Sequence, residues 1–319
     1  MQDAVRLGAR VTADFGVRLD HYDLLSSATH ASPRVNLAVQ IGGGVLHASY
    51  NRFFVPPPIE GVLASGAGLT AGIHEIGVAL PALEPTREDQ VELGASAPAG
   101  PLRLGLTGYF RATENPVHTT VWPDARIYSY GSFDRERAYG LEARAEVASL
   151  VRDGVTGHLN YALGRVNFYN PVTGGFTTEA DHLTSTDRFL APMDQTHTLG
   201  AGLTYRHAAS GVWAGTAIEY GSGTPTGHDS EDHGHEATEA DHGEDGSAGH
   251  DARVPGHFTA DLSVGIDLLR DGSRRPRLSF QFDLRNLADT VYLIAREGEF
   301  TPGQFSIPRL IGVSAKVRF

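Results

Sequence analysis

The 319-residue sequence contains no cysteine and no long hydrophobic run. The lack of cysteine suits an oxidising compartment, where free thiols are a liability. Apolar residues make up 40% of the chain but fall at alternating positions. No segment therefore offers the ~20 consecutive apolar residues of a transmembrane helix. Basic residues number only 26 against 38 acidic ones and form no stripe, which argues against nucleic-acid binding.

Signatures of catalysis are also missing. The sequence shows no Ser-His-Asp arrangement, no paired-carboxylate signature and no phosphate-binding glycine loop, since the glycine run at 42–44 has the composition of a turn. We therefore expect a protein that is not an enzyme and that requires no cofactor.

What the sequence does contain is alternation with a period of two, most clearly at 311–319. Apolar residues at the odd positions alternate there with Gly, Ser, Lys and Arg, and the segment ends on Phe319. A period of two places one set of side chains on each face of a β-strand, and this length is about what a tilted strand needs to cross a bilayer. Such a final strand is typical of bacterial outer-membrane β-barrels.

The same alternation recurs along the chain and predicts about twelve strands, several of them 10 to 16 residues long. Strands of that length are about twice the mean for globular sheets. The expected strands are 5–20, 33–41, 45–53, 87–96, 102–113, 135–150, 156–168, 195–207, 212–221, 257–270, 277–285 and 307–319.

The expected connections alternate between short and long without exception. Membrane barrels have brief turns on the periplasmic side and long loops outside, so this parity predicts a periplasmic C-terminus and extracellular long loops. A soluble β-sandwich or propeller would explain the alternation, but not the long strands, the loop asymmetry and the terminal Phe together. The short connections are expected at 42–44, 97–100, 152–154, 208–211 and 271–273, and the long ones at 54–86, 114–134, 169–194, 222–256 and 286–306.

Three segments carry motifs that are more specific than alternation alone. One strand leads directly into the three prolines at 56–58. Near the C-terminus, Asn286-Leu-Ala-Asp289 is followed by a tyrosine, a loop and a Pro-Arg pair before the last strand. The segments are 16–23 with 32–37, then 46–58, and finally 283–289 with Tyr292 and Pro308-Arg309.

Together these motifs resemble TonB-dependent outer-membrane receptors over essentially the whole chain. The final hairpin of that family commonly reads Asn-Leu-Phe-Asp, so Ala288 is a mild departure. The resemblance implies a barrel of about 22 strands that encloses an N-terminal plug. It also implies a receptor that binds a scarce nutrient on its outer face and admits it with energy relayed by TonB.

About twelve strands are visible in the sequence, so we expect residues 1–319 to be part of an all-β, transmembrane antiparallel β-barrel. The plug, the TonB-contact segment and the first ten or so strands are then absent, and two strand edges would need partners that lipid cannot supply. Residues 1–6 lack the features of a secretory signal, which also suggests an incomplete piece of a longer protein. The implied partners are outer-membrane lipid, the TonB complex through a plug outside this chain, and the nutrient.

Residues 222–256 form a loop rich in His, Asp and Glu within this barrel domain. Between 228 and 252 lie five of the 15 histidines, nine acidic residues and no basic one, and the near absence of aliphatic residues prevents a core. Imidazole suits Zn²⁺, Ni²⁺ and Cu²⁺, and carboxylates can complete a shell. The candidate metal ligands are His228, Asp232, His233, His235, Glu236, His242, His250 and His257.

Three interpretations of this loop stay open. It captures a divalent metal ion, zinc first, or a metal chelate as the cargo of a metal-importing receptor. It binds or buffers metal on a receptor for a siderophore, haem or another organic nutrient. It is a solvated acidic loop with incidental affinity. A passive porin-like barrel without TonB coupling is an alternative of a different class.

Other polar residues have weaker claims to a role. Four histidines in loops or at strand ends could contribute to a substrate site, and several arginines and aspartates are expected to line the inner wall of the barrel, facing the plug. The histidines are His74, His118, His182 and His197, and the wall residues include Arg103, Asp261, Asp267, Asp283 and Arg285.

Overall fold

The computed structural model describes ten stretches of the chain, and within them strands account for almost all regular structure. No helix in these stretches is long and apolar enough to cross a membrane. The described residues are 2–23, 27–61, 78–79, 81–122, 127–147, 154–177, 187–226, 253–270, 276–296 and 303–318.

The strands are long and follow one another with little other structure between them. The longest, β9 and β10, have 21 and 23 residues. In chain order the strands are β1 Gln2–Leu7, β2 Val11–Asp23, β3 Ser27–Ile41, β4 Gly44–Val55, β5 Val78–Ala79, β6 Thr86–Ala99, β7 Leu102–Glu114, β8 Val117–Trp122, β9 Ile127–Val147, β10 Val155–Thr177, β11 Arg188–Leu190, β12 His197–Arg206, β13 Val212–Gly221, β14 His257–Arg270, β15 Pro276–Arg285, β16 Leu293–Ala295, β17 Gln304–Phe305 and β18 Leu310–Val317.

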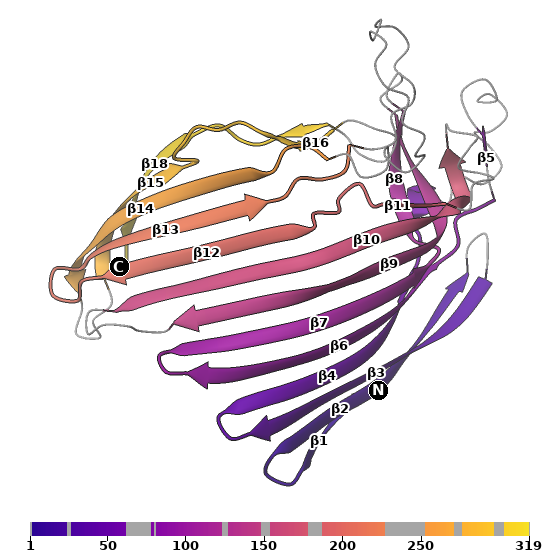
Figure 1. Ribbon diagram of the computed structural model, residues 1–319, viewed down its shortest axis with the longest axis horizontal. Coiled ribbons are helices and arrows are strands. Elements are labelled where there is room, and N and C mark those ends of the chain that lie inside the picture. The colour runs from indigo at the N-terminus through magenta and orange to yellow at the C-terminus, as the bar shows by residue number, and fades with distance from the viewer. Residues whose placement is uncertain are drawn as a thin grey trace, which may run out of the picture.

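The main sheet has 16 strands and is an antiparallel meander in which each long strand pairs with the next long strand along the chain. Its order is β1-β2-β3-β4-β6-β7-β9-β10-β12-β13-β14-β15-β18, while β5, β8 and β11 pair with the extended ends of β9 and β10. Figure 1 shows this sheet curving from β1 to β18, with β5, β8, β11 and β16 towards one end. That end is called the loop-rich end below. Within the described residues, β1 and β18 each pair with one neighbour only, so the sheet is open.

The register sorts the side chains into two faces. Leu93 lies opposite Gly108, which lies opposite Leu141, and Leu141 in turn lies opposite Leu163. This side is called the apolar face. The opposite side, called the polar face, carries charged and polar pairs such as Arg144 opposite Asn160. The period-two pattern of the sequence is thus preserved across neighbouring strands.

The apolar face is open to the surroundings. Leu93 is 67% exposed and Val313 is 79% exposed, and many other large apolar side chains on this face are also exposed. Monomeric soluble proteins rarely expose so many large apolar side chains on one face. A membrane barrel explains it, because there the outward face contacts lipid and the inward face is polar.

The first expected strand, 5–20, is wrong as a single element. The chain turns at Gly8, whose φ is 72°, and forms the hairpin of β1 and β2. Leu7 lies opposite Val11, so odd residues on one side of this three-residue turn face odd residues on the other. The alternation therefore passes through the turn in phase, and the pattern alone does not reveal it.

The expected alternation of short and long connections also fails at one place. Only residues 24–26 separate β2 from β3, at the end of the sheet where the long connections lie. Strands β8 and β9 occupy most of one expected long connection, 114–134, and β10 and β11 occupy part of another, 169–194. The sheet thus continues well beyond the strands that alternation predicts.

The C-terminal motif has a clear structural role. Asn286 follows β15, is 5% exposed and adopts a left-handed conformation with φ of 52°. Its Nδ2 donates hydrogen bonds to the carbonyl oxygens of Thr290 and Ile307, both at 3.0 Å, and its Oδ1 accepts one from the Thr290 amide. Asp289 Oδ1 accepts a hydrogen bond from the Arg309 amide. The motif therefore ties the connection after β15 to the chain entering β18.

Candidate functional site

Most of the candidate metal ligands lie outside the described residues. This holds for His228, Asp232, His233, His235, Glu236, His242 and His250, and also for two of the other candidate histidines, His74 and His182. Among the residues that the structure does describe, no group of three or more His, Asp or Glu side chains is placed to hold a metal ion.

His257, the last of the candidate ligands, is the first residue of β14. Its ring stacks on Tyr292 with a centroid distance of 3.9 Å and an interplanar angle of 6°. It lies opposite Gly221, where an added Cβ would fall 2.4 Å from the imidazole and 2.2 Å from Gln195. Gly221 thus leaves the space that this packed imidazole occupies. Burial, with a smaller effect from Glu219, raises the pKa of the Tyr292 hydroxyl.

The base of the acidic loop is held by a buried ion pair. Arg253, just after the acidic segment 228–252, pairs with Asp194, whose side chain is only 1% exposed. The Arg253 guanidinium also donates hydrogen bonds to the backbone carbonyl oxygens of Asp194 and Gly223, each at 3.0 Å. The Asp194 carboxylate accepts a further hydrogen bond, at 2.6 Å, from the amide of Val166 in β10. A bridge between Pro225 and Arg253 closes the base. The two ends of the loop are therefore fixed against the barrel wall.

An aromatic cluster lies near the loop-rich end. Phe133, Phe168 and Phe189 have ring centroids 4.9 to 5.6 Å apart. His118 joins them, with its ring centroid 4.2 Å from that of Phe168. Phe133 and Phe168 are each only 1% exposed, so this is the best-packed apolar region among the described residues.

Charged side chains adjoin this cluster. The Glu136 carboxylate, 7% exposed, lies 3.4 Å from His118 Nε2 and 3.4 Å from the Arg111 guanidinium. Arg111 also lies 3.7 Å from Glu88. Two carboxylates thus share one guanidinium beside the imidazole. Of the two described candidate histidines, His118 belongs to this group, whereas His197 bonds to Tyr161 at 2.7 Å on the apolar face.

The polar face forms a trough of about 1040 Å³ along the half of the strands that lies away from the loop-rich end. Two of its carboxylates are hydrogen-bonded to polar groups on the same wall. The Asp283 carboxylate accepts hydrogen bonds from the Ser263 hydroxyl at 2.5 Å and from the Gln281 side-chain amide at 2.8 Å. The Asp261 carboxylate accepts one from the backbone amide of Asn286 at 2.8 Å. Three wall residues expected from the sequence, Asp261, Asp283 and Arg285, line this trough.

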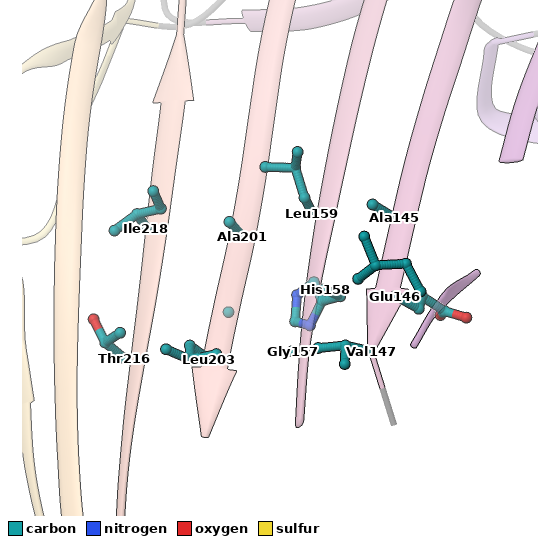
Figure 2. A pocket seen from close by; sticks show the side chains of 12 residues that line it. Ala145, Glu146, Val147, Gly157, His158, Leu159, Ala201, Leu203, Thr216 and Ile218 are labelled. Atoms are coloured by element: carbon teal, nitrogen blue, oxygen red, sulfur yellow. The ribbon is translucent and has the colours of Figure 1, made fainter. Parts of the chain in front are cut away.

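A second, smaller groove of about 320 Å³ opens on the apolar face. Figure 2 shows Leu159 of β10, Ala201 and Leu203 of β12, and Ile218 of β13 around it. The groove exists because small residues such as Ala201 do not fill the space between the larger side chains. Its lining is mostly apolar, and Glu146 and His158, which also border it, lie opposite each other on β9 and β10.

Sequence reasoning missed the Asp194–Arg253 pair and the Glu136–Arg111–Glu88 group. Each joins residues distant in sequence that only the strand register brings together. The one available signal was His118, which lies in the expected long connection 114–134.

The model of the family described as "TonB dependent receptor-like, beta-barrel" matches residues 1–287. A comparison with curated proteins finds no match.

Solved structures with the same fold include three metal-related transporters. The ferric-catecholate import receptor Fiu from K12 E. coli has a TM-score of 0.64 and 17% identity, covering 100% of this chain and 44% of that one. The FrpB iron transporter from Neisseria meningitidis has a TM-score of 0.65 and 14% identity, covering 98% and 44%. The copper transporter OprC has a TM-score of 0.67 and 12% identity, covering 100% and 46%. The chain therefore spans less than half the length of these structures.

Proposed function

The chain belongs to the TonB-dependent receptor family, whose barrels lie in the outer membrane, and from that premise we propose that it forms part of a receptor for a divalent metal ion, zinc first, or a metal chelate. The supporting observation is the segment 228–252, with five histidines and nine acidic residues, on a base fixed to the barrel by Arg253 and Asp194. Imidazole and carboxylate are the ligands that zinc prefers when thiolates are absent.

The position of this segment in the chain suits a role in capturing the ion before it enters the barrel. It connects β13 to β14 at the loop-rich end, which we assign to the extracellular side, with the C-terminal end of β18 towards the periplasm. Metal ligands concentrated in one segment at the mouth of a barrel would raise the local concentration of the ion that they bind. TonB then supplies the energy for passage, and the cargo and the TonB complex are the partners of the whole receptor.

The relatives support metal-related cargo without identifying it. The printed names of the solved structures are a ferric-catecholate receptor, an iron transporter and a copper transporter. A receptor for an organic iron chelate is the second candidate. It is favoured by the ferric-catecholate receptor among these structures, since a catecholate complex of iron is an organic chelate.

Calorimetric titration with zinc tests the proposal directly. The receptor, expressed from its complete gene and purified in detergent, should bind zinc in the micromolar range. Replacing the five histidines between 228 and 252 with asparagine should abolish this binding, because asparagine keeps side-chain size and polarity but removes the imidazole ligands. Zinc binding weaker than roughly millimolar in the unchanged receptor would overturn the metal proposal and favour the organic chelate.

A further inference from the structure

The apolar face ends abruptly towards the loop-rich end, and the residues that replace it are basic. The register forms a row of Tyr50, Val91, Phe110 and Tyr139, which lie opposite one another on β4, β6, β7 and β9. Beyond that row, on the same face, lie several arginines and few acids. Aromatic rows of this kind lie at the boundary between hydrocarbon and water. The arginines therefore lie where the headgroups of one leaflet begin.

This set is called the arginine belt. Its members are Arg52, Arg87, Arg135 and Arg137 beyond the row and Arg165 level with it, and the acidic side chains between them on the same face are Asp89 and Glu114. The belt is positively charged although the whole chain has a net charge of -12.

The arginines differ in their partners. Arg52 binds Asp89 through two hydrogen bonds of 2.7 and 2.9 Å, and Arg135 pairs with Asp134 at 2.6 Å. Within the described part of the chain, Arg137 and Arg165 have no carboxylate within ion-pair distance. Arg137 lies over the Phe110 ring, with its guanidinium carbon 5.9 Å from the centroid.

Arg137 and Arg165 are also close to each other. Arg165 lies directly opposite Tyr139, two residues from Arg137 on β9, so the two arginines are diagonal neighbours. Diagonal side chains on adjacent strands have Cβ atoms about 7–8 Å apart, within reach of a shared ligand for residues of this length. Two guanidinium groups with free donors suit a phosphate, which accepts two parallel hydrogen bonds from each.

An apolar groove of about 1160 Å³ extends along the apolar face from the level of Tyr139 and Arg165. It is lined by Leu93, Leu141, Leu163 and Phe110, and Arg165 forms part of its edge. A hydrocarbon chain in this groove would place an attached phosphate at Arg165 and Arg137. A free anion would use the arginines but gain nothing from the groove.

We propose that the groove and the Arg137–Arg165 pair bind a lipid with a phosphate-bearing headgroup from the leaflet at the loop-rich end. The acyl chain lies along the apolar face and the two guanidinium groups hold the phosphate. This site is separate from the nutrient pathway, because it lies on the opposite face of the sheet from the polar trough.

Native mass spectrometry of the receptor expressed from its complete gene tests the site, with a short-chain phosphatidic acid as the probe. The R137Q/R165Q variant should bind this lipid roughly tenfold more weakly than the unchanged receptor, because each basic group near a membrane surface contributes to binding. The matched control, R103Q/R144Q, removes two arginines of β7 and β9 from the polar face and should leave binding unchanged. R137K/R165K keeps the charge but loses the paired donors of each guanidinium, so it should bind the lipid more tightly than R137Q/R165Q and more weakly than the unchanged receptor.

Two further measurements separate a lipid from a free anion. Inorganic phosphate at the same concentration should not displace the lipid, and A95L, which narrows the groove, should weaken lipid binding. Equal losses in R137Q/R165Q and R103Q/R144Q, or no loss in either, would overturn the proposal. Displacement by inorganic phosphate together with unchanged binding by A95L would show an anion site in place of a lipid site, and would overturn it as well.

Discussion

Single residues fix the positions of the connections at the loop-rich end. Asp194 and Arg253 lie 59 positions apart in sequence, yet their pair joins the segment before β12 to the chain entering β14. Asn286 does the same for the connection after β15 through two carbonyl groups and one amide. Both depend on side chains that are almost fully buried, so their loss is costly.

Replacing Arg253 with alanine should lower the free energy of unfolding by about 3 kcal/mol, because it leaves the buried Asp194 carboxylate without its partner. Urea unfolding of the receptor in lipid vesicles, followed by tryptophan fluorescence, measures this change. The matched control is Arg18→Ala, which removes an ion pair whose arginine side chain is 67% exposed and should cost at most about 1 kcal/mol. Similar losses in the two variants would contradict the role given to the buried pair.

Replacing Asn286 with alanine should lower the free energy of unfolding by about 2 kcal/mol, since three hydrogen bonds and a residue tolerant of φ near 52° are lost together. Asn286→Gly tolerates the same conformation without the hydrogen bonds, and the same unfolding measurement distinguishes the two effects. Glycine should recover only part of the loss. Full recovery would show that the backbone conformation alone is what Asn286 provides.

At the scale of the elements, strand faces are readable from sequence and strand ends are not. Alternation predicts the apolar and polar sides correctly because burial in lipid imposes a strict period of two. It does not detect the turn at Gly8, where the period continues in phase, or the extensions of β9 and β10, which lie beyond the apolar band. Outside the lipid, no apolar face has to be maintained.

The candidate site likewise has one part that the sequence predicts and one part that it does not. Composition identifies the His-rich loop because its residue types are unusual, independent of any neighbour. The group of Glu136, Arg111 and Glu88 depends on the pairing of β6, β7 and β9, which composition does not encode.

The two faces of β18 should respond differently to the same substitution. Val313, on the apolar face opposite Phe282, is 79% exposed, whereas Ser314 is on the polar face opposite Gln281. Val313→Arg should cost about 2–4 kcal/mol when the site lies near the bilayer centre, and Ser314→Arg should be nearly neutral. Unfolding in vesicles measures both. The reverse order would show that the face assignment of the last strand is wrong.

At the scale of the whole molecule, the open sheet and the family match describe a barrel wall. The chain spans 44 to 46% of the three solved structures compared above, and within its described residues the strands form one continuous antiparallel sheet. Under the proposed function, the polar trough faces the path of the nutrient and the apolar face contacts lipid.

The family's coupling to TonB leads to a prediction for the complete receptor in cells. Uptake of its cargo should stop when the proton-motive force is collapsed, whereas a passive porin would continue to admit it. Measuring uptake with and without a protonophore distinguishes the two. Uptake that persists unchanged would contradict coupled transport.

The most direct test of the central claim is the uptake of radioactive zinc by metal-starved cells that express the complete receptor. Cells with the unchanged receptor are compared with cells in which His228, His233, His235, His242 and His250 are all asparagine. At limiting zinc, the variant should take up the metal roughly tenfold more slowly, because the loop no longer concentrates the ion above the barrel. Equal rates in the two strains would contradict a metal-capturing role for this loop.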